Sequence, residues 1–331
     1  MSKEIYDITI IGAGPVGLYA GFYAGMRSVK TQIIESLPQV GGQLQAIYPE
    51  KYIHDVAGHT KVKASELVEQ LSKQVEKMPE VEIKVGQSVT DIEKVGDNYL
   101  VTTDKGAYET KSIILATGNG SFNPRQLAAD VDKNLVNEEE RIFYHVDKLD
   151  NYRELDVVVA GGGDSAIDIA MMLVQVANKV YLVHRRKEFR ALEESVRQLH
   201  LSGVEVLTPY KFNNIQDAGD AIEINLTKVK SQDEERTISV DKLIVNYGFL
   251  SDNSHSKNWQ IDLNKNRGLY EVDSLMETNM PLIYAIGDGA TYPGKLKLIS
   301  QGFGEGPTAV NQIVEKLYPK NSRIVHSTSL F

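Results

Sequence analysis

The sequence predicts an α/β protein of two Rossmann-like domains, each with three layers (ββα), the second domain being inserted into the first. Three observations support this prediction. A strand, a glycine-rich turn, a helix and a second strand occupy residues 8–35, and the same order returns at 156–186. An apolar run ending in glycine precedes this repeat at 112–118, and a similar run follows it at 242–248. The length of 331 residues also exceeds what one hydrophobic core usually serves.

The first glycine-rich turn has the spacing Gly-x-Gly-x-x-Gly. An apolar run (8–11) stops at this turn, and a helix of small residues is predicted over 15–26. The first glycine of such a motif permits a tight turn, the second lets backbone approach a pyrophosphate, and the third lets helix pack on strand. The helix start also offers unpaired N–H groups to phosphates. The residues predicted to bind here are Gly12, Gly14, Pro15 and Gly17.

A second apolar run, 31–34, ends on Glu35, which lies 23 positions after Gly12. A carboxylate at the end of the second strand accepts hydrogen bonds from both hydroxyls of an adenosine ribose. The glycine spacing alone is weak evidence, because many such turns serve only close packing. Strand, helix and acid together predict a dinucleotide site for an adenosine with a free ribose.

The loop after Glu35 also has residues suited to a ligand. Gly41-Gly42 allows a close approach, Gln43 offers neutral hydrogen bonds, and the ring of Tyr48 is suited to lie on a flat cofactor. The alternative is a surface turn with a core tyrosine. His54-Asp55 is a possible general-base pair, but such a pair more often caps a loop.

Between the two motifs, an amphipathic helix is predicted over 63–76, with Ser65 as N-cap. Short alternating runs then predict an antiparallel meander of four strands with glycine turns between them. The run 112–118, ending in Ala-Thr-Gly, is predicted as a separate buried strand. The meander strands are expected at 81–85, 89–92, 99–103 and 107–110.

The second glycine-rich turn repeats the first, with alanine as its third small residue. His184-Arg185-Arg186 stands where the first motif has its acid, with Arg185 24 positions after Gly161. Guanidinium groups accommodate a ribose 2′-phosphate, so this site is predicted to bind NADP. The alternative is a solvated basic cluster, but its register with the first motif favours a binding role. The predicted NADP residues are Gly161, Gly163, Asp164, Ser165, Ala166, His184, Arg185, Arg186 and Arg190.

The last part of the chain is predicted to return to the first domain. A strand ends in Gly287-Asp288, which places a carboxylate where it can bind a polyol hydroxyl. The glycine-rich run 302–307 is expected to open a helix at 308–318, whose positive end would favour negative charge on a nearby ring. The resulting domains are 1–118 with 247–331, and 119–246.

The composition excludes several classes of chemistry. The chain has no cysteine, which rules out a disulfide, a Cys-ligated metal, a thiolate nucleophile and a redox Cys-x-x-Cys. Any redox chemistry therefore requires a bound cofactor. The net charge of −9 gives no support to nucleic-acid binding, and no apolar run approaches the roughly 20 residues of a membrane span. The N-terminal apolar stretch holds the glycine motif and does not resemble a signal peptide, so a cytoplasmic protein is expected.

Together these motifs resemble the two-domain flavoproteins related to thioredoxin reductase. Thioredoxin reductases themselves carry Cys-x-x-Cys before the second motif, and the comparable stretch here, 143–147, has no sulfur. The chain is instead similar to thioredoxin-reductase-like ferredoxin/flavodoxin–NADP⁺ reductases, which share the loop 43–48 and a tail like 326–331. The resemblance implies FAD in the first domain, NADP(H) in the second, a homodimer, no metal, and ferredoxin or flavodoxin as protein acceptor.

The resemblance also implies roles for single residues around FAD. Glu35 would bind the adenosine ribose, Gln43 would contact the flavin, and Asp288 would bind the ribityl chain. Tyr48 would cover one flavin face and His326, from the partner subunit, the other. These two and Ser327 are the catalytic candidates, through flavin stacking and gating. The remaining residues expected at FAD are Gly42, Val89 (adenine), Phe122 (flavin), Gly287, Thr328 and Ser329.

The implied reaction is hydride transfer from NADPH to flavin N5, followed by single-electron transfers to the carrier. It needs no nucleophile, general base or metal. One alternative is an NADPH-dependent reductase of free flavin, quinone or ferric complexes, and another is a non-catalytic redox sensor. From residue 290 onward the chain has five basic residues against two acids, which predicts a basic patch able to attract an acidic partner. The alternative is ordinary scatter of surface lysines. The five are Lys295, Lys297, Lys316, Lys320 and Arg323.

Overall fold

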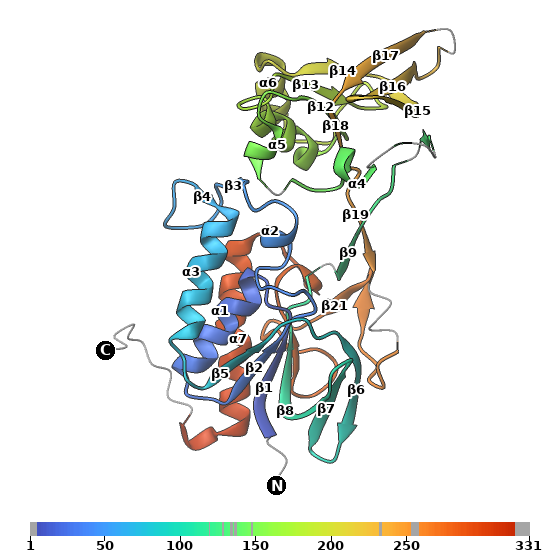
Figure 1. Ribbon diagram of the computed structural model, residues 1–331. Helices are drawn as coiled ribbons and strands as arrows, with labels where there is room; N and C mark the ends of the chain where they lie inside the picture. Colours follow the sequence, from blue (N-terminus) through green and yellow to red (C-terminus); the bar gives the residue numbers. More distant parts are fainter. Residues whose placement is uncertain are drawn as a thin grey trace. The chain divides into compact units, whose positions relative to one another are not determined.

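The computed structural model describes residues 5–118, 120–127, 129–132, 135, 138–146, 148–231, 234–252 and 258–321. The chain forms two compact units, each coloured by sequence in Figure 1. Unit 1 comprises 1–46, 52–122 and 251–331, and unit 2 comprises 47–51 and 123–250. The strands β9 (Ser121–Pro124) and β19 (Phe249–Asp252), which connect the units, pair with each other. Each unit is built on a sheet with a parallel core of strands, together with helices, so the predicted α/β class with two Rossmann-like sheets is confirmed.

Unit 1 is organised around a seven-stranded sheet in the order β5-β2-β1-β8-β7-β6, with β22 also pairing with β8. The pairs β5–β2, β2–β1, β1–β8 and β8–β22 are parallel. β6, β7 and β8 form an antiparallel meander. The strands are β1 (Ile5–Ile11), β2 (Thr31–Ile34), β5 (Val81–Lys84), β6 (Val89–Val95), β7 (Asn98–Thr103), β8 (Ala107–Leu115) and β22 (Ile283–Ala285).

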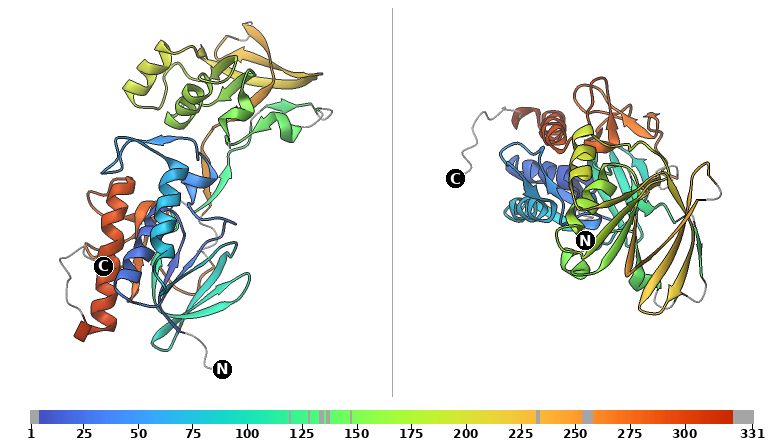
Figure 2. Two further views of the ribbon diagram at one scale, coloured as in Figure 1. Left: turned by 60° about the vertical axis from the view of Figure 1, so that its left-hand side comes forward. Right: turned by 90° about the horizontal axis from the view of Figure 1, so that it is seen from above.

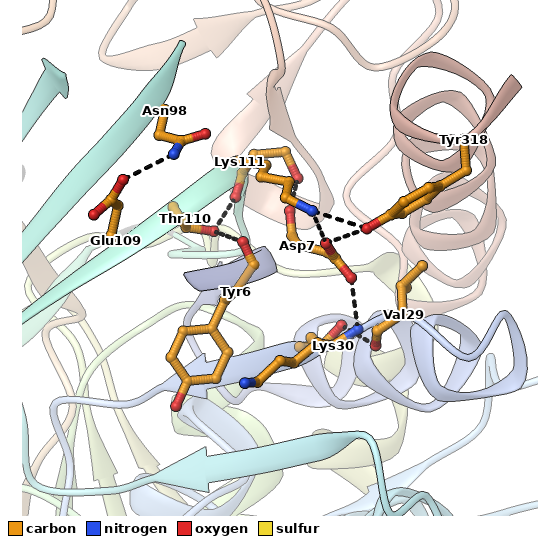
Figure 3. Close-up of polar contacts among 11 residues, drawn as sticks. Tyr6, Asp7, Val29, Lys30, Asn98, Glu109, Thr110, Lys111 and Tyr318 are labelled. Atoms are coloured by element: carbon orange, nitrogen blue, oxygen red, sulfur yellow. Dashed lines mark hydrogen bonds and ion pairs between the residues drawn. The ribbon is translucent and has the colours of Figure 1, made fainter. Parts of the chain in front are cut away.

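Two of the strand predictions are wrong. The run 81–85 is predicted in the meander, but β5 pairs in parallel with β2 at the far edge of the sheet. The runs 107–110 and 112–118 are predicted as separate strands, but they form the single strand β8. Lys111 interrupts the apolar pattern, and its amine donates hydrogen bonds to Asp7 Oδ1 at 2.7 Å and to the Tyr318 hydroxyl oxygen at 2.9 Å (Figure 3). Because this charge is bound, the strand continues through it.

Three helices cover one face of this sheet, α1 (Pro15–Met26), α3 (Ala64–Glu76) and α7 (Ile299–Leu317) (Figures 1 and 2). The prediction of Ser65 as N-cap is wrong, because α3 begins one residue after Lys63 and has no side-chain cap. An apolar core that includes Trp259 and Tyr270 fills the other face. The short elements are α2 (Gln43–Ala46), β3 (Tyr52–Ile53), β4 (Val62–Lys63), β20 (Lys265–Asn266), β21 (Leu269–Glu271), η3 (Gly287–Gly289), β23 (Ala290–Thr291) and η4 (Pro319–Asn321).

Unit 2 has a five-stranded parallel sheet, β11-β18-β12-β13-β14, and a four-stranded sheet, β10-β15-β16-β17. Alternate residues of β12 separate its two cores: Val157 and Val159 pack toward α5, and Val158 and Ala160 pack toward the second sheet. The elements are β10 (Asp130–Val131), α4 (Glu138–Arg141), β11 (Ile142–Phe143), η1 (Leu149–Tyr152), β12 (Asp156–Ala160), α5 (Asp164–Leu173), β13 (Lys179–Val183), α6 (Glu193–Leu201), β14 (Glu205–Leu207), β15 (Tyr210–Ala218), β16 (Ala221–Lys228), β17 (Glu235–Val240) and β18 (Lys242–Val245).

Candidate functional site

In unit 1, the turn between β1 and α1 has the geometry that phosphate binding requires. Gly12 has φ +107°, and a β-carbon placed there would lie 2.4 Å from the carbonyl oxygen of Ala116. A β-carbon at Gly17 would lie 2.0 Å from the carbonyl oxygen of Gly12, so helix and turn touch. Gly14 has no neighbour within 4 Å of its β-carbon position, and no side chain caps the helix. The start of α1 therefore presents open backbone, with Pro15 as its first residue.

Glu35 follows β2 at the same edge of the sheet, and only 7% of its surface is exposed. Its Oε2 accepts a hydrogen bond from the backbone N–H of Ala13 at 2.8 Å, and its Oε1 accepts one from Leu37 at 2.9 Å. The Ser36 hydroxyl also donates to Oε1 at 3.2 Å. A carboxylate has about four acceptor positions, so about one remains for a hydroxyl group of a ligand. The carboxylate is thus fixed against the glycine turn, as a ribose-binding acid should be.

The loop after Glu35 lies against this turn. The Gly41 N–H donates to the carbonyl of Ala13 at 2.8 Å, and a β-carbon at Gly42 would lie 3.2 Å from Gly14 Cα. Gln43 begins α2 and is partly exposed. This places a neutral amide directly after the loop that touches the phosphate turn.

Tyr48 and Val89 fall in different surroundings. Tyr48 belongs to the segment 47–51, which groups with unit 2, and the Lys51 amine lies 5.5 Å from the centre of its ring. Val89 opens β6 and is buried in the apolar core of unit 1. The proposed contacts of these residues with flavin and adenine stay predictions.

The turn at Gly287–Gly289 reaches the same edge of the unit 1 sheet. Gly287 has φ +69°, and a β-carbon at Gly289 would lie 3.0 Å from the carbonyl oxygen of Gly118, which follows β8. Both glycines are buried, whereas Asp288 between them is partly exposed. The Asp288 side chain has no hydrogen bond to the described part of the chain. Its carboxylate is therefore available at the end of β22.

The prediction of a helix starting at residue 308 is wrong. α7 begins at Ile299 and carries the whole glycine-rich run within it, with Pro307 inside. A β-carbon at Gly302 would lie 2.4 Å from Val16, and one at Gly306 would lie 3.2 Å from Ala20. These glycines therefore serve close packing on α1, and tertiary contact overrides their low helix propensity. The helix end that carries the positive dipole lies nine residues earlier than expected.

In unit 2, the second glycine turn is closed by the loop that follows β13. A β-carbon at Gly161 would lie 2.4 Å from the carbonyl oxygen of Asn246. Asp164 opens α5, and its Oδ1 accepts from the Leu192 N–H at 2.9 Å. The N–H of Arg190 donates to the carbonyl of Gly162 at 2.7 Å. The arginine-bearing loop is thereby attached to the turn. The remaining motif residues are the buried Ala166, the partly exposed Gly163 and the exposed Ser165.

His184 is the partly buried member of this basic segment. Its ring stacks on Phe189 with centroids 5.4 Å apart, and a β-carbon at Gly162 would lie 2.2 Å from its Nδ1. Burial, aided by the charges of nearby arginines, lowers the pKa of His184, so the ring is neutral at pH 7. Its Nε2 is buried without a partner among the described residues. A polar atom in that state fits a ligand that completes the site.

Arg185, Arg186 and Arg190 are exposed, and none of them forms an ion pair with another described residue. They follow β13, at the carboxyl ends of the parallel strands of unit 2. Ligands bind at that edge in such sheets. The three charges are therefore exposed at the end of the sheet where ligands bind in such folds.

The expected basic patch is only partly present. The side chain of Lys295 is 6% exposed and is paired with the buried Glu305, and Lys316 binds Glu277 at 2.5 Å. The burial of Glu305 is not predicted from the sequence, because nothing in its glycine-rich surroundings marks it as buried. No cluster of metal-ligating side chains occurs within the described ranges, nor is any helix there long and apolar enough to cross a membrane. The side chain of Phe122 and the residues His326, Ser327, Thr328, Ser329 and Arg323 lie outside what the structure describes.

Comparison with known proteins places these sites in context. The family described as pyridine nucleotide-disulphide oxidoreductase matches residues 6–312. The ferredoxin–NADP reductase of Pediococcus pentosaceus is 52% identical, with 99% of each chain covered. That of Lactiplantibacillus plantarum is 47% identical over 100% of this chain and 99% of its own. Among solved structures, thioredoxin reductase of Lactococcus lactis (FR conformation) has a TM-score of 0.77 at 26% identity, with 94% of this chain and 98% of that chain covered.

Proposed function

Because the chain belongs to the pyridine nucleotide-disulphide oxidoreductase family and within it to the ferredoxin–NADP reductases, we propose that it transfers electrons between NADPH and ferredoxin or flavodoxin by means of FAD. Family membership implies binding of FAD and of NAD(P). The choice of NADP over NAD, the carrier and the assignment of each site are the parts that we propose from this chain's own residues.

One observation carries the proposal. The chain has two glycine turns at the carboxyl ends of parallel strands, one with Glu35 and the other with exposed arginines, and it has no cysteine anywhere. The acid suits a free ribose and the arginines suit a 2′-phosphate. Without a thiol, electrons cannot leave through a protein disulfide. An outside electron carrier is therefore the natural acceptor.

The residues of unit 1 fit FAD. The open backbone at Gly14 suits the pyrophosphate, Glu35 the ribose, and the available carboxylate of Asp288 the ribityl hydroxyls. The chemistry that a bound FAD supplies is the conversion of a two-electron donor into one-electron transfers. The protein's own part is to bind and orient this group, and no side chain has to accept a proton or attack a substrate.

The residues of unit 2 fit NADP(H). The Nε2 of His184, which has no hydrogen-bond partner in the described part of the chain, lies on the segment that closes the second turn. The exposed guanidinium groups of Arg185 and Arg186 lie on the same segment. A neutral His184 contributes a hydrogen bond, and the arginines contribute the charge. This division predicts that preference for the 2′-phosphate depends on the arginines.

We also propose that the protein is a homodimer in which His326 of the partner subunit covers the flavin, as the family resemblance implies. Light scattering of the purified protein tests the dimer, and the rate at which NADPH reduces the flavin, with and without residues 322–331, tests the role of the tail. A dimer of the full chain supports the proposal. A monomer would refute it, and a truncated dimer with unchanged flavin reactivity would remove the role of the tail.

The function is tested by anaerobic NADPH oxidation by the purified holoprotein, with ferredoxin or flavodoxin coupled to cytochrome c. We expect cytochrome reduction to depend strongly on the carrier, with the carrier-free reaction as control. The same assay with free flavin, a quinone and a ferric complex tests the alternative. If these small acceptors are reduced faster than the carrier, the protein is a small-acceptor reductase.

A further inference from the structure

A buried polar cluster lies between the Gly287–Gly289 turn and α7. Its centre is Glu305, which is 4% exposed and lies in the second turn of α7. Its Oε2 accepts a hydrogen bond from the backbone N–H of Gly287 at 2.7 Å. Its Oε1 accepts one from the Tyr292 hydroxyl at 2.6 Å and pairs with the amine of Lys295. The carboxylate thus connects the turn, the following loop and the helix.

The cluster is matched in charge and in hydrogen bonds. The side chain of Lys295 is 6% exposed, so this is a buried ion pair that adds no net charge to its surroundings. Burial, with the hydrogen bond to Glu305, raises the pKa of Tyr292, which keeps the phenol protonated as a donor. Gln301 donates to the Tyr292 oxygen at 2.7 Å and accepts from the Leu296 N–H at 2.9 Å. The loop that carries Lys295 is therefore held in place as well.

The bond from Glu305 to Gly287 acts on the backbone beside Asp288. Gly287 has a left-handed backbone (φ +69°), and its N–H would be buried without a partner if Glu305 were absent. An unsatisfied buried N–H is costly, so such a turn would move to satisfy it. Asp288 follows directly, and any movement of Gly287 displaces its carboxylate.

We propose that Glu305 is a positioning residue for FAD: through the N–H of Gly287 it fixes the carboxylate of Asp288, and Lys295 and Tyr292 hold Glu305 in place. This inference rests on the proposed function, because it assumes that Asp288 binds FAD. In this inference Lys295 acts as a member of a buried ion pair and not as part of a surface patch that attracts the carrier.

Two double variants separate the hydrogen bond from the ion pair. Lys295→Met with Glu305→Gln removes both charges and keeps an amide oxygen for Gly287, whereas Lys295→Met with Glu305→Leu removes that acceptor too. Replacing both members of a buried pair avoids an isolated buried charge. We expect the leucine double variant to bind FAD about tenfold to a hundredfold more weakly than the glutamine one. FAD titration of the full-length apoprotein, followed by flavin fluorescence, measures this ratio.

The matched control is Lys316→Met, which breaks the other ion pair of α7, with Glu277, far along the helix from the turn. It should bind FAD within twofold of wild type. Urea unfolding of each apoprotein is measured in parallel, since a role limited to stability would shift the unfolding midpoint and leave the FAD dissociation constant unchanged. Equal FAD dissociation constants for the two double variants would overturn the inference.

Two further outcomes are decisive. Failure of the wild type to bind FAD would overturn the proposed function and this inference together, whereas tight wild-type binding with equal double variants would overturn the inference alone. If the leucine variant does not fold, hydrogen exchange in the wild-type apoprotein decides. The Gly287 amide should then be protected from exchange, and rapid exchange at this amide would contradict the hydrogen bond from Gly287 to Glu305 on which the inference depends.

Discussion

Replacement of Arg185 and Arg186 by alanine tests the assignment of the second site to NADP. The two guanidinium groups are exposed and form no ion pair with other described residues, so their removal leaves no carboxylate without its partner. They also lie after β13 on a loop attached through Arg190 to the glycine turn. Their loss should therefore affect the ligand and leave the fold intact.

The magnitude follows from the exposure of these groups. Hydrogen bonds to charged groups contribute about 1.5–3 kcal/mol, and solvent around an exposed arginine places each near or below the lower end of that range. Two such contacts give about 2–3 kcal/mol, or about a 30- to 150-fold loss in kcat/KM for NADPH. His184 does not compensate, because burial lowers its pKa and leaves it neutral. NADH lacks the 2′-phosphate, so its kcat/KM should change less than about threefold.

The assay compares both nucleotides with a small dye as acceptor, which avoids any dependence on the protein carrier. Arg153→Ala is the control. This arginine pairs with Asp150 at 2.6 Å and precedes β12, so it lies at the amino ends of the strands, away from the glycine turn. It should alter neither nucleotide. Equal losses for NADPH and NADH in the double variant would refute the 2′-phosphate assignment.

Two other variants test unit 1. Gly12→Ala puts a β-carbon 2.4 Å from the Ala116 oxygen at φ +107°, so it should destabilise the apoprotein by about 2–4 kcal/mol and abolish FAD retention. The control Gly58→Ala, at φ +90° with open space around it, should cost about 1 kcal/mol. Equal losses of the two variants in urea unfolding would contradict the close-contact argument. Burial would raise the pKa of Asp7, but hydrogen bonds from Lys111 and Tyr318 outweigh it and lower the pKa below 3.8 (Figure 3). This stabilisation is complete above the unfolded-state pKa and is lost as the pH falls through the lower folded-state value. Asp7→Asn should therefore cost about 1 kcal/mol at pH 7, after a discount for solvent at Lys111, and the difference should shrink toward pH 3; a constant difference would count against it.

Sequence reasoning located the parts of the site whose requirements are local. The spacing around Gly12 and the acid at Glu35 needs only a strand, a turn and a helix, and α1 and β2 begin and end where predicted. The second turn at Gly161 is likewise followed by a helix and a strand, α5 and β13, within the predicted range 156–186, although α5 ends at Leu173, earlier than its pattern indicates. The meander failed at β5, because an apolar alternation does not state which neighbour a strand pairs with. That choice is made by the sheet as a whole.

The error in α7 has a related cause with a different physical content. Glycine at 302 and 306 has poor helix propensity, so a local reading ends or delays the helix there. A β-carbon at 302 would overlap Val16, and one at 306 would crowd Ala20 at 3.2 Å. These contacts exist only after the two helices have met. A glycine required by packing and a glycine required by a turn look alike in a sequence. Only the partner distinguishes them.

Glu305 and Lys295 carry the same argument into electrostatics. A count of formal charges treats Lys295 as a surface cation, but ten residues later in the chain its partner is buried with it. Their charges cancel inside the protein, so neither contributes to the field that a ferredoxin would meet. We therefore replace the expectation that Lys295 attracts the carrier with the proposal that Lys295 supports the Gly287–Gly289 turn. Removal of this pair should lower the affinity for FAD and leave the salt dependence of carrier reduction unchanged. That result distinguishes a buried residue that positions FAD from a surface residue that attracts the carrier.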